Sequence, residues 1–140
     1  MAKVLTFSQP SISAASALDW VNQAFQVAKG MDLSIGACVV DVNGLVKAKV
    51  MMDGVSLITD ELIERKAKTS LLGLNSQDLA AAIEGSAPTV ASLTNLADIT
   101  LMGGGFPIYS DGVLVGGFAV GGALVEQDIA CAEAVIAHFA

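Results

Sequence analysis

The chain has few of the residues from which metal sites and nucleophilic enzymes are usually built. It has one histidine and two cysteines in 140 residues. A lone His138 cannot form a site of several imidazoles, nor can a serine or cysteine nucleophile paired with a histidine base be argued from it. Cys38 and Cys131 lie in apolar stretches, which favours buried free thiols over a disulfide or a metal pair. We therefore expect no metal site.

Long apolar runs and a leader sequence are also missing. No run approaches the roughly 18 residues that span a bilayer, and the first residues lack a leader's apolar core and cleavage site. We expect a cytoplasmic protein without membrane contact. The net charge of −7 argues against nucleic acid and anionic lipid surfaces as partners.

Charged residues make up only 15% of the chain, and hydrophobic residues make up 54%. The length is typical of one domain, which we place at 1–140. A monomer of this composition has difficulty hiding its apolar surface. The alternatives are a core rich in small residues and a homo-oligomer, and we favour the homo-oligomer.

Two turn signals set between apolar runs are the clearest structural features. Asn43-Gly44 predicts a hairpin over 33–41 and 45–52, and Asp111-Gly112 predicts a second over 106–110 and 113–120. Both dipeptides suit a two-residue type I′ turn, which needs positive φ at both positions. The sequence thus predicts two tight hairpins.

The remaining segments are mostly helical in pattern. Caps and apolar spacing predict a helix from Ser11 or Ser13 to about Lys29 and another from Ser56 or Thr59 to about Leu72. Further helices are predicted over about 76–84 and 125–139, a loop with one helical turn or none over 85–97, and a short strand over 99–102. Residues 3–7 are expected to form a strand or an extended arm. The fold class is α+β, with a single antiparallel sheet of about five strands and covering helices.

Residues 65–69 carry one candidate binding site. Arg65 and Thr69 share a helical face and Lys66 lies beside them, so cations and a hydroxyl could bind a carboxylate there. The alternative is a solvated face with Glu61–Arg65 and Glu64–Lys68 pairs. Both interpretations remain open.

The run from Gly103 to Pro107 is the second candidate. Gly103, Gly104 and Gly105 precede Phe106-Pro107 and a strand, which fits neither a dinucleotide fingerprint nor a P-loop. Three glycines allow unusual dihedrals or a close backbone approach. The run is either a ligand-contacting loop or a tight start to the strand.

Carboxylates for proton transfer are available at Asp53, Glu126 and Asp128. The alternative for the pair at 126 and 128 is to satisfy a helix N-terminus. His138 could be a single axial ligand to haem iron or a residue that favours the helix dipole.

Four segments together resemble the GlcG/HbpS-like group, the haem-degrading or DUF336 domain. They are 35–44, 52–55, 63–70 and 103–128, in an order and spacing that run along nearly the whole chain. The last is the most specific, with Gly-Gly-Gly-Phe-Pro-Ile, Asp-Gly-Val-Leu-Val-Gly-Gly-Phe-Ala-Val-Gly-Gly and Glu-Gln-Asp.

The resemblance implies a profilin-like α+β fold, assembly into oligomers and binding of haem or a corrinoid. It also implies a common pocket or interface around a set of matching positions: Asp53, Lys66, Thr69, Gly103–Gly105, Pro107 and Asp128. The chain departs from the haem-binding pattern because its only axial ligand candidates are Cys38, Cys131, His138 and the methionines.

Three functions follow as hypotheses. The first is a binding or accessory protein of a catabolic operon, for a small anionic organic molecule such as a tetrapyrrole. The second is a cofactor-independent lyase or isomerase, with Lys66 positioning a carboxylate or acting as base and Asp53, Glu126 or Asp128 moving protons. The third is a structural assembly partner.

Overall fold

The computed structural model describes residues 3–140, which form four strands in one antiparallel sheet and five α-helices. The expected α+β class with a single antiparallel sheet is confirmed. In chain order the elements are α1 (Ala14–Gly30), β1 (Gly36–Asp41), β2 (Val46–Met51), α2 (Leu57–Thr69), the 3-10 turn η1 (Ser70–Leu72), α3 (Ser76–Ile83), α4 (Ala87–Thr94), β3 (Gly105–Ser110), β4 (Val113–Gly121) and α5 (Val125–Phe139).

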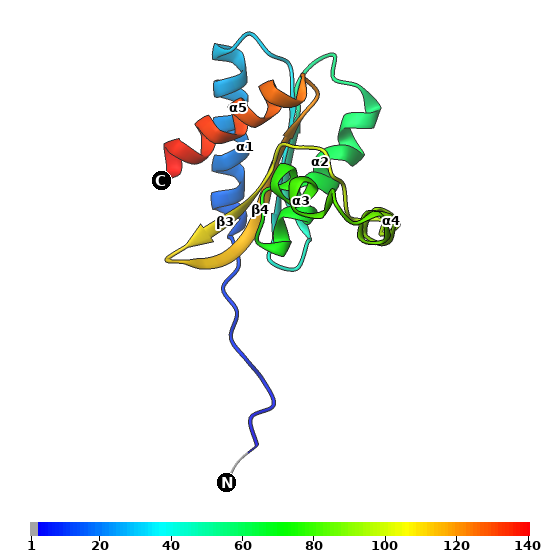
Figure 1. Cartoon of the computed structure of the whole chain (residues 1–140). Coiled ribbons are helices and arrows are strands. Elements are labelled where there is room, and N and C mark those ends of the chain that lie inside the picture. Colours follow the sequence, from blue (N-terminus) through cyan, green and yellow to red (C-terminus); the bar gives the residue numbers. More distant parts are fainter. Residues whose placement is uncertain (1–2) are drawn as a thin grey trace.

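The sheet has helices on both faces (Figure 1). Its strand order is β2-β1-β4-β3, so the two hairpins join through the antiparallel pairing of β1 with β4. Side chains alternate between the faces of a strand. Val39 and Phe118 pack in the cluster that contains α1 and α5 residues, whereas Cys38 and Ala119 pack with Ile63 and other α2 residues. This two-sided cover explains why β1 is buried along its whole length.

The first hairpin has a different turn from the one predicted. Gly44 has a positive φ of 90°, but Asn43 is not among the residues with positive φ. The Gly44 N–H donates to Asp41 O, and the Asp41 N–H donates to Leu45 O. The loop is thus a three-residue type I turn closed by a glycine bulge. The Asp41 carboxylate stabilises it by accepting from the Asn43 and Leu45 N–H groups.

The second hairpin has the predicted type I′ turn. Asp111 has a φ of 50° and Gly112 a φ of 78°, so both central residues are left-handed. Here no side chain offers the backbone a competing set of hydrogen bonds, and the dipeptide's preference decides the turn.

The predicted strand at 99–102 is wrong, and the sheet has four strands rather than about five. Its backbone is held by threonine side chains: Thr100 N–H donates to Thr69 Oγ1 at 2.9 Å and Met102 N–H to Thr100 Oγ1 at 3.3 Å. The predicted loop 85–97 contains helix α4, which Ser86 caps by accepting from Thr89 N–H.

The long helices agree with their sequence signals. Ser13 caps α1 by accepting from Ser16 N–H at 3.1 Å, and α5 runs over the predicted 125–139. Within the described residues, no helix is both long and apolar enough to cross a bilayer.

Candidate functional site

Lys66 lies in the interior of the protein. It follows Ile63 by three residues and precedes Ser70 by four, so it belongs to the buried stripe of α2 and η1. Its side chain has no exposed surface. The Nζ atom donates to Val120 O at 3.0 Å and to Asp128 Oδ2 at 3.1 Å. The ion pair therefore ties α2 to the end of β4 and to α5.

Asp128 is the other half of this pair and is only 2% exposed. Its Oδ1 accepts from Ala123 N–H at 3.0 Å, so the carboxylate also holds the segment that leads into α5. Burial raises the pKa of Asp128 although Lys66 opposes this. Burial likewise lowers the pKa of Lys66, against the opposing effect of Asp128. Desolvation thus outweighs the attraction within the pair.

The glycine run passes directly over Lys66. Gly104 has a φ of 118°, and a Cβ there would lie 2.6 Å from Val120 O and 3.1 Å from Lys66 Nζ. A Cβ on Gly105 would overlap the carbonyl oxygen of Lys66. The glycines are needed because the loop backbone touches helix α2 and the ion pair.

Helix α3 fixes this loop from outside. Ser76 Oγ accepts from Gly105 N–H at 2.9 Å, and Gln77 Oε1 accepts from Gly104 N–H at 3.3 Å. The sequence predicts only that a helix begins at these two residues. In the structure, Ser76 also has no exposed surface. A fully buried serine at the start of a short helix is visible only in the folded chain.

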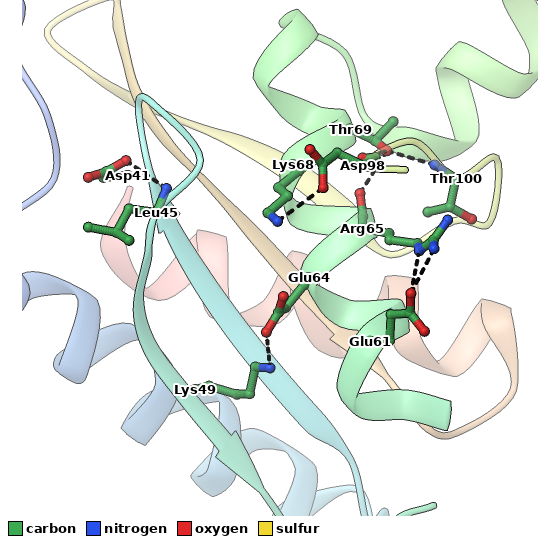
Figure 2. A network of polar contacts seen from close by, with 10 residues as sticks. All are labelled: Asp41, Leu45, Lys49, Glu61, Glu64, Arg65, Lys68, Thr69, Asp98 and Thr100. Atoms are coloured by element: carbon green, nitrogen blue, oxygen red, sulfur yellow. Dashed lines mark hydrogen bonds and ion pairs between the residues drawn. The ribbon is translucent and has the colours of Figure 1, made fainter. Parts of the chain in front are cut away.

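Thr69 lies on α2 with Lys66 but forms a different set of hydrogen bonds. Its hydroxyl donates to Arg65 O at 2.7 Å and accepts from Thr100 N–H, which anchors the loop before β3 (Figure 2). Arg65 is partly exposed and pairs with Glu61 at 2.7 Å, as the surface-face interpretation predicted. Arg65 and Lys66 therefore point to different environments.

Two other cations near α2, Lys68 and Lys49, are paired as well (Figure 2). Lys68 contacts Asp98 at 3.1 Å, while Lys49 on β2 contacts Asp60 at 2.6 Å and also Glu64. The predicted Glu64–Lys68 pair is wrong, because β2 brings Lys49 within reach of Glu64.

The structure does not bring the remaining candidates to the ion pair. Asp53 and Glu126 are exposed, and the Asp53 carbonyl accepts from Ser34 Oγ at 2.6 Å. Phe106 packs in the core on the α1 and α5 side, and Pro107 lies in the edge strand β3. Catalytic or ligand-binding roles for all these residues stay predictions.

Three surface grooves have volumes of about 500, 440 and 340 Å³. The largest lies between the first hairpin turn and Lys68, Leu71 and Asp98. Neither Lys66 nor Asp128 lines any of the three. The ion pair is therefore shielded from any ligand bound in these three grooves.

The groove of 340 Å³ contains the chain's one histidine. His138 and Phe139 of α5 form one side, and four α1 residues form the other: Asp19, Asn22, Gln23 and Gln26. Phe139 stacks on Trp20 with ring centroids 4.8 Å apart and planes 9° apart. The groove thus offers an imidazole, an aromatic edge and amide groups that can donate hydrogen bonds.

Other metal ligands are poorly placed. Burial raises the pKa of the Cys38 thiol to about 12 and that of Cys131 to about 11, which disfavours the thiolates that bind metals. Over residues 3–140, no three histidine, cysteine or acidic side chains gather where they could hold an ion.

Comparison with known proteins adds the following. The model of the family described as "Haem degrading protein HbpS-like" matches residues 12–137. The corrinoid adenosyltransferase PduO of Citrobacter freundii is 28% identical over 112 residues, which are 79% of this chain and 33% of PduO. The chain spans about a third of the length of the curated relatives it matches.

Solved structures share the fold. The Klebsiella pneumoniae protein ORFY, assigned to DUF336, superposes with a TM-score of 0.88 at 22% identity, covering 99% of this chain and 97% of that one. A structure described as a PduOC:heme complex has a TM-score of 0.82 at 25% identity, covering 91% and 94%.

Proposed function

The chain belongs to the HbpS-like family, and we propose that it is an accessory protein that binds a tetrapyrrole, haem or a corrinoid. The observation that carries the proposal is the position of His138, in a groove edged by Phe139 and faced by three amide side chains. An imidazole is a common axial ligand of haem iron. The names of a haem complex and of a corrinoid enzyme among its relatives support the ligand class.

In this proposal the imidazole of His138 would hold the macrocycle by binding its metal. Asn22, Gln23 and Gln26 would donate hydrogen bonds to the carboxylates or amides of the macrocycle. Asp19 lines the same groove and repels an anionic rim. The protein therefore binds and orients the group, and the group supplies the metal chemistry.

Titration with ferric haem and with a cobalt corrinoid tests the proposal. We expect a saturable change of the Soret band, or of the corrinoid spectrum, at micromolar concentration. His138→Ala should remove the axial-ligand signature, and added imidazole should restore it. Asp19→Asn should bind haem more tightly, whereas Glu133→Gln, which lies on α5 with His138 but outside the groove, should behave as the parent.

Two results would count against it in different ways. No saturable change with either compound would remove tetrapyrrole binding. An unchanged spectrum in His138→Ala would keep the binding but remove His138 as its ligand.

A cofactor-independent lyase or isomerase is the second candidate. Burial lowers the pKa of Lys66 and raises the pKa of Asp128, so that both pKa values shift in the direction of neutral pH. Shifts of this kind are typical of acid–base sites and favour this candidate. It ranks second because neither side chain reaches a groove. A folded Lys66→Ala variant that keeps full turnover on an identified substrate would remove it.

A further inference from the structure

The segment before α1 exposes large apolar side chains. Val4, Leu5 and Phe7 are 86, 80 and 82% exposed. Residues 3–10 run away from the body of the protein rather than along it (Figure 1). In an extended chain Leu5 and Phe7 point to the same side. The arm, residues 3–9, thus presents an apolar edge that its own chain does not cover.

The root of the arm is held and directed outward. Ile12 N–H donates to Val115 O at 2.9 Å, and Ser11 Oγ accepts from Val42 N–H at 3.1 Å. Pro10 follows the arm and biases Gln9 toward extended backbone. A tight reversal at Gln9 is therefore disfavoured, and the arm continues away from its own body.

A groove lined by both apolar side chains and hydroxyl groups lies at this root. It is the groove of about 440 Å³, between the start of α1, the β3–β4 hairpin and the end of α5. Pro10 and Ile12 form part of its wall, together with Trp20, Val115 and Phe139. No charged side chain lines it. It is a suitable receptor for an extended apolar segment.

We propose that this groove binds the arm of a second copy of the chain, in a reciprocal exchange. Because the arm starts at the groove's edge, two copies related by a two-fold axis beside Pro10 can each place Leu5 and Phe7 in the other's groove. Extended, seven residues span about 23 Å, which is enough to cross to a neighbour.

Charge favours this occupant. Two copies with a net charge of −7 each repel one another. The arm carries one lysine, Lys3, and no acidic residue, and the groove is free of charge. The exchange therefore brings together two parts of the chain that carry no negative charge.

Disulfide trapping between differently tagged chains tests the exchange. Phe7→Cys chains are mixed with Ser16→Cys chains, since Ser16 is an exposed part of the groove lining. The natural cysteines are fully buried and do not interfere. We expect the mixed disulfide to form at least tenfold faster than in the matched mixture with Glu84→Cys, an exposed position at the end of α3.

Two outcomes of trapping would overturn the proposal. One is equal trapping of Phe7→Cys by Glu84→Cys, which indicates random collision. The other is a link within one chain of a Phe7→Cys/Ser16→Cys double variant and none between chains, which indicates that the arm folds back onto its own groove.

Light scattering gives a second, independent readout. The parent should have the mass of a dimer or a multiple of it, and Leu5→Ser/Phe7→Ser should have a smaller mass with an unchanged circular dichroism spectrum. Thr6→Ser serves as the control and should keep the parent mass. A monomeric parent at 100 µM, or an unchanged mass in the double variant, would overturn the proposal.

Discussion

Lys66 and Asp128, which are 62 residues apart in the chain, form an ion pair that is almost completely shielded from solvent. Because removal of one partner leaves a buried charge without compensation, Lys66→Met and Asp128→Asn should each lower the free energy of unfolding by about 3–5 kcal/mol. The Lys66→Met/Asp128→Asn double variant should lose about 2–3 kcal/mol less than the sum. Urea unfolding of the four proteins measures this, and additive losses would show that the pair is not coupled.

The same two variants should differ in the sign of their pH dependence. In Lys66→Met the pKa of Asp128, already raised by burial, rises further because the cation is gone. The folded state then binds more protons than the unfolded state, so the deficit relative to the parent grows as pH rises from about 4.5 to 7.5.

In Asp128→Asn the argument reverses. The pKa of Lys66, lowered by burial, falls further without its carboxylate. The unfolded state now binds more protons, so the deficit shrinks as pH rises toward the ordinary lysine range. Unfolding free energies at several pH values check both slopes. Parallel slopes in the two variants would contradict the assignment.

The sequence predicted the elements better than the contacts between them. Caps and turn dipeptides are local, so α1, α5 and the second hairpin could be located. The first turn could not be identified, because the Asp41 carboxylate stabilises a longer loop than Asn43-Gly44 prefers. The strand expected at 99–102 failed because side-chain hydrogen bonds from the Thr69 region replace sheet pairing there.

The sequence carries a signal for the burial of Lys66. Ile63, Lys66, Ala67 and Ser70 have the spacing of a buried helical stripe. Charge instead favours placing Lys66 with Arg65 and Thr69 in one binding site, which is how the sequence alone is interpreted. Its partners at Val120 and Asp128 come from distant segments, so no local pattern could identify them.

The glycine run should tolerate no side chain over Lys66. Gly105→Ala should lower the free energy of unfolding by about 2–4 kcal/mol, because its Cβ overlaps backbone that cannot move freely. Gly30→Ala is the matched control: it ends α1, has no atom within 4 Å of the added Cβ, and should be neutral or stabilise by up to about 1 kcal/mol. Thermal and urea unfolding compare them. Equal stability of the two variants would mean that the loop does not lie against α2.

Both natural thiols should be inert in the folded protein. Cys38 and Cys131 have no exposed surface, and burial raises their pKa values to about 12 and about 11, so almost no thiolate is present at pH 8. A thiol reagent at pH 8 should label neither residue before the chain opens, and both in urea. Glu84→Cys, at an exposed position outside the grooves, should add one thiol that reacts at once. Since the unfolded thiols ionise near pH 9 while the folded ones stay protonated, the free energy of unfolding should also fall as pH rises from 9 toward 11. Rapid labelling of the folded parent would contradict the burial of these two side chains.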